Sequence, residues 1–227
     1  MAPRDPHLTE HHLAVPRTAR YYTLGQPGAA TREVWFVLHG YGQLAGRFLR
    51  HFTALDDGSR LVVAPEALSR FYLAAPGEPH DKVGAAWMTR EDRLTDIGDY
   101  VRYLDLTAAA IARGLRRAVP MIALGFSQGT ATVARWAALG ATVIDRLILW
   151  GGEVPPDLDL SAAALRWQRL RLVLVAGERD EYITEKVLAR DIARLDEHQI
   201  AHEVVRHSGG HEIVESVLQE LIDASSV

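Results

Sequence analysis

The sequence predicts an α/β fold, in which a mostly parallel central sheet of about 7–8 strands carries helices on both faces. Short apolar runs typical of buried strands alternate along the chain with amphipathic segments typical of helices. The composition agrees, because 227 residues that are 48% hydrophobic and 24% charged can bury one substantial core. We therefore expect a single domain over residues 1–227.

The expected elements follow from these two patterns. Apolar and alternating runs predict strands at 20–24, 33–39, 60–64, 120–124, 145–150, 171–176 and 201–206, with an additional edge strand allowed around 12–16. Helices are expected at 44–55, 94–113, 128–139, 183–197 and 212–223. The helix at 94–113 has one apolar stripe, and Gly114 is placed to end it. The segment 155–160, rich in Pro and Asp, is the clearest loop.

A serine lies between one expected strand and the helix that follows it. The segment 125–129 reads Gly-Phe-Ser-Gln-Gly, which places Ser127 at a sharp strand-to-helix turn. Such a turn exposes the serine hydroxyl above the sheet, and flanking glycines let strand and helix pack closely. Tight turns also use Gly and Ser for backbone reasons alone, so the rest of the chain must support Ser127 as a nucleophile.

A candidate acid and a candidate base follow two later strands. Asp180 comes after the apolar run 172–176, and His211 follows the alternating run 201–206. A serine needs a histidine to take its proton and a carboxylate to hold that histidine in the useful tautomer. The chain order is therefore Ser, Asp, His, each on a loop after a separate strand, whereas some serine hydrolases place the same groups in a different order. Glu153 is an alternative acid, and His207 is an alternative base at the end of its strand.

A glycine-rich turn after the strand 33–39 is a candidate oxyanion hole. Glycines let backbone N–H groups point at a developing negative charge, which is worth on the order of 3 kcal/mol per donor. We expect the N–H of Tyr41 to act with that of Gln128, the residue after the candidate nucleophile. His39 is interpreted as a structural histidine that fixes the turn.

The segment 65–93 is the least regular part of the chain, and its length is typical of a lid or binding loop. We expect it to form part of a substrate pocket. In this hypothesis Trp87 and Met88 line an apolar slot, and Arg70 or Arg90 binds a carboxylate or phosphate. The alternative is that the aromatic side chains belong to the core and the arginines are solvated.

Jointly, these motifs resemble the α/β-hydrolase superfamily, particularly its compact carboxylesterase, acyl-protein thioesterase and phospholipase-like members. The matching pieces are His-Gly-Tyr-Gly-Gln at 39–43, Gly-Phe-Ser-Gln-Gly at 125–129, Gly-Glu-Arg-Asp-Glu-Tyr-Ile at 177–183 and Gly-Gly-His at 209–211. The chain departs from the thioesterase-like pattern at Gln43, where those enzymes commonly have an acid. It departs again at 150–153, where Trp-Gly-Gly-Glu replaces a turn that often contains serine.

The resemblance implies a serine hydrolase that needs no metal or other cofactor, with Ser127, Asp180 and His211 as its triad. The expected substrates are small-molecule carboxylic esters, or thioesters, of small or medium acyl groups. An acyltransferase on the same triad is an alternative. A non-catalytic ligand-binding protein of the same fold is another.

Composition favours some locations and partners over others. The chain has no cysteine, which excludes disulfides and cysteine-based metal sites and is typical of a cytoplasmic protein. Its net charge of −4 gives no basic footprint for nucleic acid. We expect no membrane span, because no window approaches the roughly 18 apolar residues required. A homodimer is the expected assembly for a compact enzyme of this kind.

Overall fold

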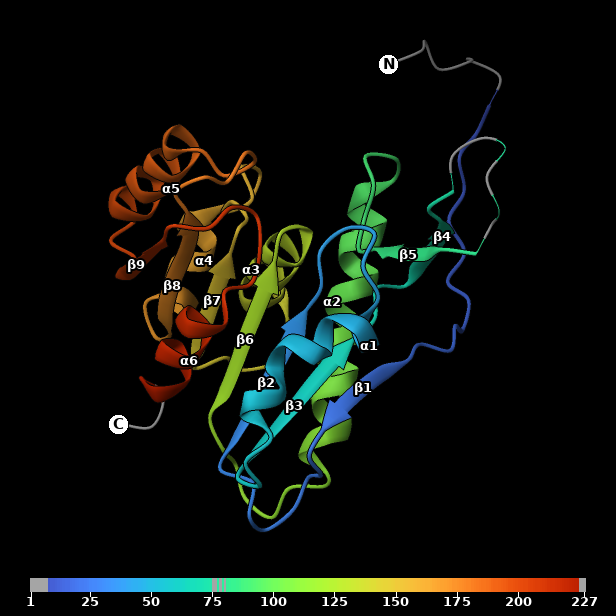
Figure 1. Cartoon of the computed structure of the whole chain (residues 1–227). Helices are drawn as coiled ribbons and strands as arrows, with labels where there is room; N and C mark the ends of the chain where they lie inside the picture. Colours follow the sequence, from blue (N-terminus) through green and yellow to red (C-terminus); the bar gives the residue numbers. More distant parts are fainter. Residues whose placement is uncertain (1–7, 75–76, 78, 80, 225–227) are drawn as a thin grey trace.

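The computed structural model describes residues 8–74, 77, 79 and 81–224, and it has a seven-stranded sheet at its centre (Figure 1). The strands are β1 (Tyr21–Leu24), β2 (Glu33–Leu38), β3 (Arg60–Pro65), β6 (Met121–Phe126), β7 (Arg146–Trp150), β8 (Arg171–Gly177) and β9 (His202–His207). Their order is β1-β3-β2-β6-β7-β8-β9. β1 pairs antiparallel with β3, and every other pair of neighbouring strands in this sheet is parallel. The predicted α/β class and mostly parallel sheet are confirmed.

Helices cover both faces of this sheet (Figure 1). They are α1 (Ala45–Phe48), the 3₁₀ helix η1 (Leu49–Leu55), α2 (Arg93–Ala112), α3 (Gln128–Leu139), α4 (Leu160–Trp167), α5 (Glu185–Glu197) and α6 (Glu215–Asp223). In β2, Val34 and Phe36 belong to the buried cluster under α2 to α5, whereas Trp35 and Val37 belong to the one under α1, η1 and α6. Because successive side chains of a strand point to opposite faces, a continuous apolar strand serves both clusters.

The parallel strands end at one edge of the sheet, and this edge positions the candidate site. In Figure 1 the arrows of β2, β6, β7 and β8 point to the same side. The loops after β2, β6, β8 and β9 carry Tyr41, Ser127, Asp180 and His211 respectively. Open α/β sheets build their sites at the carboxyl ends of their strands.

Three local expectations were wrong. Residues 12–16 form no strand, so β1 ends the sheet. The single helix expected at 44–55 is a short α1 followed by η1, with a kink at Phe52. A helix that was not expected, α4, starts at Leu160 where Asp159 caps its N-terminus by accepting from Ser161 and Ala162.

The irregular segment 65–93 contains a two-stranded antiparallel hairpin, β4 (Ser69–Tyr72) and β5 (Val83–Ala86). Residues 75–76, 78 and 80 of this segment lie outside the described residues, as do 1–7 and 225–227. The hairpin is bonded to the turn after β2, because Gly42 N–H donates to Ala85 O (2.9 Å) and Ala85 N–H donates to Gln43 O (3.1 Å). The segment therefore packs beside the candidate oxyanion turn.

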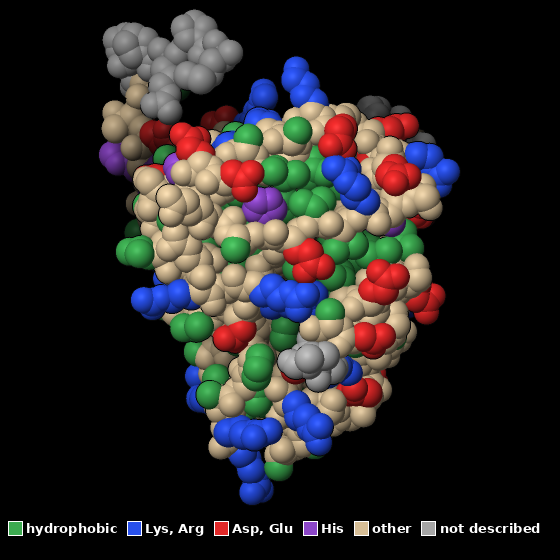
Figure 2. All heavy atoms as spheres, turned by 90° about the vertical axis from the view of Figure 1, so that its left-hand side faces the viewer, with side chains coloured by type: hydrophobic (Ala, Val, Ile, Leu, Met, Phe, Trp, Pro, Cys, Tyr) green, Lys and Arg blue, Asp and Glu red, His purple; other side chains and the backbone are tan. Residues whose placement is uncertain are grey.

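The face formed by the elements on the left of Figure 1 mixes acidic and basic side chains over most of its area (Figure 2). Exposed ion pairs such as Arg171–Glu203 (3.0 Å) and Arg206–Glu185 (2.6 Å) account for part of this mixture. Within the described ranges, no helix combines the length and apolar content that crossing a bilayer requires.

Candidate active site

Ser127 occupies a strained turn between β6 and α3. Its φ of 55° and ψ of −119° lie where non-glycine residues are rare. The turn is held by a hydrogen bond from Ser127 N–H to Trp150 O (3.0 Å). The flanking glycines are required sterically, since a Cβ on Gly125 would lie 2.2 Å from the carbonyl oxygen of Gly129. Strand and helix thus approach as closely as the sequence motif predicts.

Asp180 and His211 form a hydrogen-bonded acid–base pair. Asp180 Oδ2 lies 2.8 Å from His211 Nδ1. Its other oxygen, Oδ1, accepts from the N–H groups of Tyr182 (2.8 Å) and Ile183 (3.0 Å). Burial alone would raise the pKa of Asp180, but the bonds from His211, Ile183 and Tyr182 outweigh it and lower the pKa. Asp180 is therefore held as a carboxylate that orients the His211 ring.

The His211 ring lies against the turn that carries Ser127. Its centroid is 4.9 Å from that of Phe126, the residue before Ser127, and 4.7 Å from that of Tyr182. Gly151 lies beside the ring and has a φ of 58°, a conformation that favours glycine. No hydrogen bond joins Ser127 to His211 among the residues that the structure describes. Free hydrolases often make this bond only when substrate binds.

The two alternative residues have other partners. Glu153 pairs with Arg190 (2.6 Å) instead of a histidine. His207 is buried, and its Nδ1 accepts the Gly209 N–H (3.1 Å) beneath the loop that carries His211. Burial lowers the pKa of His207, against an opposing effect of Glu212, Asp180 and Glu178. This placement suits a residue that shapes the loop better than one that reaches a substrate.

The turn after β2 lies against the turn of Ser127 and has a free donor. A Cβ on Gly40 would lie 3.0 Å from Ser127 Cβ, so the two turns are in contact. Gln43 folds its side chain back to accept the Gly40 N–H (2.8 Å). Within the described part of the chain no acceptor takes the Tyr41 N–H. Gln128 begins α3, and the first N–H groups of a helix have no acceptor within it.

His39 has the structural role that the sequence suggested. It is fully buried, its Nε2 accepts the Ala67 N–H (3.1 Å), and its Nδ1 lies 2.8 Å from Gly40 O. These contacts assign the proton to Nδ1 and tie the turn to the start of segment 65–93. Burial lowers the pKa of His39 despite the opposing bond to Gly40.

The four residues expected to form a substrate pocket range from buried to exposed. Trp87 is 2% exposed, packs against His39 and donates its indole N–H to His39 O (2.9 Å), so its ring belongs to the core behind the turn and does not line an apolar slot. Met88 is partly buried over the core. Arg70 lies 3.5 Å from the buried Glu66, whereas Arg90 is exposed and has no ion pair among the described residues.

The sequence did not predict the roles of two side chains near the site, those of Gln128 and Tyr182. Gln128 holds segment 65–93 through its side-chain amide, which accepts from Trp87 N–H (2.9 Å) and donates to Met88 O (2.9 Å). Tyr182 is 71% exposed beside His211. Its place two residues after Asp180, in a turn held by that carboxylate, was the available signal.

The sheet and the strand-to-helix serine turn define the class, a serine hydrolase of the α/β-hydrolase fold. The chain belongs to the family described as Serine hydrolase (FSH1), whose model matches residues 35–216. A comparison with curated proteins gave no match.

Solved structures of esterases and of a thioesterase share the fold. Acyl-protein thioesterase 2 from Zea mays is 17% identical with a TM-score of 0.73, and the match covers 92% of this chain and 98% of the thioesterase chain. Esterase PE8 is 19% identical with a TM-score of 0.72, over 92% and 99%. A carboxylesterase from Mesorhizobium loti is 17% identical with a TM-score of 0.64, over 90% and 94%. At these identities the likeness establishes the fold alone.

Proposed function

We propose that this serine hydrolase cleaves carboxylic esters of small or medium acyl groups, with Ser127 as nucleophile, His211 as base and Asp180 as acid. The observation that carries the proposal is the 2.8 Å bond between His211 Nδ1 and Asp180 Oδ2, made by a ring that packs against Phe126, the residue before Ser127. A histidine held in this way has its Nε2 free to accept a proton.

The reaction would run in two steps. Ser127 Oγ attacks the ester carbonyl carbon while His211 Nε2 takes the hydroxyl proton. The ester carbonyl oxygen becomes negative and accepts hydrogen bonds from the backbone N–H groups of Tyr41 and Gln128. His211 then gives its proton to the alcohol as the carbon–oxygen bond breaks. Water adds to the acyl-serine by the same route, which releases the carboxylic acid and restores Ser127.

The surroundings of the site support an acyl pocket bordered by aromatic side chains. Tyr41 is 60% exposed and packs against Phe71 of the hairpin with the ring centroids 5.1 Å apart, and Tyr182 packs against His211. Arg90 offers an exposed cation next to Met88 for an acidic substrate group. The thioesterase among the structural neighbours makes thioesters the second substrate class to test.

Hydrolysis of p-nitrophenyl acetate, p-nitrophenyl octanoate and an octanoyl thioester tests the proposal. Wild type and Ser208→Ala, an exposed serine on the loop of His211, should turn over the esters, and Ser127→Ala should not. Equal activity of Ser127→Ala and wild type would refute the assignment. Added alcohol that diverts the acyl group into a new ester would show acyl transfer. A cytoplasmic location and a homodimer stay predictions from the sequence.

A further inference from the structure

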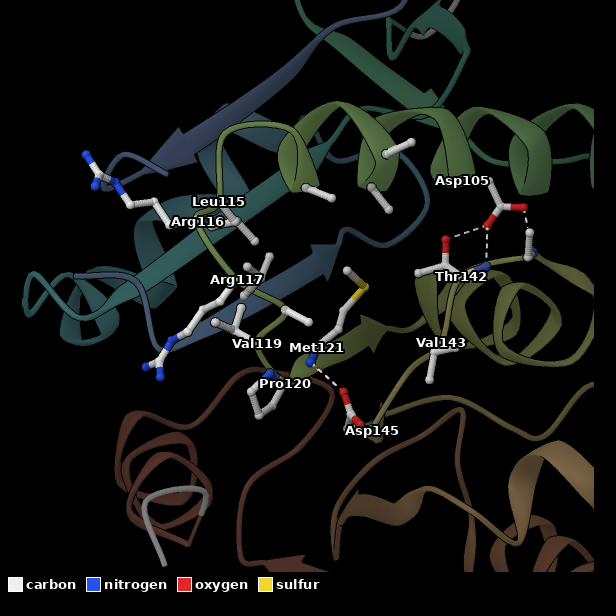
Figure 3. Close-up of a pocket in the computed structure, with 16 residues that line it drawn as sticks. Asp105, Leu115, Arg116, Arg117, Val119, Pro120, Met121, Thr142, Val143 and Asp145 are labelled. Carbon is white, nitrogen blue, oxygen red and sulfur yellow. Dashed lines mark hydrogen bonds between the residues drawn. The ribbon is translucent and has the colours of Figure 1, made fainter. Parts of the chain in front are cut away.

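A large hollow lies where β2 and β6 begin, whereas Ser127 follows the end of β6 (Figure 3). Its volume is about 920 Å³, within the range of about 300–1,000 Å³ typical of small-molecule sites. One wall is the second half of α2 with the loop that follows it, and the other is the loop between α3 and β7. The strands begin here, so this hollow is separate from the candidate active site.

Small and apolar side chains create the hollow. Ala108, Ala109 and Ala112 lie on one face of α2, because residues three and four apart are neighbours on a helix. Their methyl groups leave space that larger side chains would fill. Met121 forms part of the floor, and Val143 borders the hollow at 75% exposure. Apolar surface left open to water in this way favours an apolar ligand.

The two carboxylates that line the hollow are hydrogen-bonded within the protein. At one end, Asp105 accepts from Trp136 (2.8 Å), Ala141 (2.7 Å) and Thr142 (2.6 Å to the hydroxyl). Burial would raise the pKa of Asp105, but these bonds lower it, so its negative charge is present and internally stabilised. On the floor, Asp145 accepts the Met121 N–H (2.7 Å).

Two cations mark the other end. Arg116 and Arg117 leave the loop after α2 on the side away from Asp105, and their side chains point apart and outward (Figure 3). Across the residues that the structure describes, neither arginine forms an ion pair. Lys and Arg side chains also gather at the lower end of the face in Figure 2, where the strands begin. A ligand in the hollow would thus meet unpaired positive charge at one end and apolar surface along its length.

We propose that this hollow is a second binding site, for an aliphatic chain that ends in a carboxylate. The head would bind at the end marked by Arg116 and Arg117, whose exposed side chains would turn toward it. The chain would lie along Ala108, Ala109 and Ala112 toward Asp105. The carboxylate stays at the arginine end because Asp105 and Asp145 repel it elsewhere. The site binds without reaction, and the proposal rests on these residues and not on the esterase assignment.

Methionine methyl groups allow a test that reads both sites at once. The chain has three methionines, Met1, Met88 and Met121. Met121 lies on the floor of the hollow, and Met88 is bonded to Gln128 beside the candidate active site. The full chain, labelled with ¹³C-methyl methionine, is titrated with decanoate and separately with decanol. A second sample is first treated with a fluorophosphonate, which would block Ser127.

We expect decanoate to shift the Met121 signal saturably in both samples, and decanol to bind roughly tenfold more weakly. The double variant Arg116→Ala/Arg117→Ala should weaken decanoate binding by a similar factor. Arg113→Ala, which removes one positive charge at the end of α2 outside the hollow, should not. Ala112→Phe should prevent the shift by filling the space.

Three results would overturn the proposal. The first is a decanoate response of Met88 alone, which would place the chain only at the active site. The second is equal binding of decanol and decanoate, because the head would then contribute nothing. The third is an unchanged affinity in the double arginine variant. Absence of a fluorophosphonate adduct would count against the esterase proposal and leave the Met121 readout intact.

Discussion

The side-chain oxygen of Gln128 accepts the backbone N–H of Trp87 at 2.9 Å. The same amide donates to Met88 O, so one side chain next to Ser127 binds both the N–H of Trp87 and the carbonyl of Met88. Because the indole of Trp87 in turn donates to His39 O, Gln128 links the turn of Ser127 to the turn after β2.

Replacement of Gln128 should therefore harm catalysis more than a surface change would. Gln128→Ala leaves the Trp87 N–H without its acceptor, which costs about 1–3 kcal/mol of unfolding free energy. We expect kcat/KM to fall by roughly tenfold or more, as a small misplacement of catalytic donors is costly. Gln128→Glu keeps the acceptor and should retain more activity. Denaturant unfolding and ester kinetics on both variants check this, and wild-type kinetics in Gln128→Ala would contradict it.

Asp180→Asn tests whether Asp180 or Glu153 is the carboxylate that orients His211. The amide oxygen of Asn would stay with the N–H groups of Tyr182 and Ile183, so the amide NH2 would donate to His211 Nδ1 and favour the wrong tautomer. We expect kcat to fall by roughly 10³–10⁴-fold. Glu153→Gln is the matched control, because Glu153 pairs with Arg190 and should leave kcat near that of wild type. If steady-state kinetics show the larger loss in Glu153→Gln, the acid has been assigned to the wrong strand.

The contact between the hairpin and the oxyanion turn leaves no room for a methyl group at Gly84. A Cβ there would lie 2.5 Å from the carbonyl oxygen of Gly42, so Gly84→Ala must move one of the two backbones. A shift of about 1 Å in the turn can cost roughly 10²-fold in rate.

Gly98→Ala provides the control, since an added methyl group on α2 meets no atom within 4 Å. It should raise the unfolding free energy by about 0.5–1 kcal/mol and leave kcat/KM unchanged. Similar kinetics for the Gly84 and Gly98 variants would show that the hairpin does not support the site.

His207 should make the fold less stable in acid. Its pKa is lowered by burial, so the folded chain binds fewer protons here than the unfolded chain, whose histidine pKa is about 6.5. The stabilisation is complete above about pH 6.5 and is lost as the pH falls toward the lowered pKa. The buried His39 acts in the same direction.

His207→Asn can keep the acceptor for Gly209 N–H and does not titrate, so its unfolding free energy should decline less than that of wild type between about pH 7.5 and 5.5. Urea unfolding at the two pH values measures the difference. Its ester hydrolysis should persist at neutral pH, whereas His211→Asn should be inactive. A parallel decline of stability in variant and wild type would remove His207 as the cause.

Much of the fold could be predicted because its signals are local. The apolar run before Ser127 and the glycines around it specify a strand, a turn and a helix within a dozen residues, and the acid and base follow their own strands in the same manner. Parallel strands bring such loops to one edge. The candidate site residues were thus found by their positions relative to strands.

What the sequence did not predict depends on contacts between distant segments. Trp87 looked like a pocket residue, and only the packing against His39 and Tyr100 shows that it is core. The hairpin within 65–93 is short and is completed by the turn after β2. The helix at 160–167 was hidden by the prolines before it, although Asp159 is a good cap.

The most direct measurement of the central claim is the intact mass of the protein after treatment with a fluorophosphonate, followed by peptide mapping. We expect one adduct on wild type and on Ser208→Ala, located on Ser127, and none on Ser127→Ala. Labelling of Ser127→Ala to the same extent, or an adduct on a different residue of wild type, would contradict the assignment of Ser127 as the nucleophile.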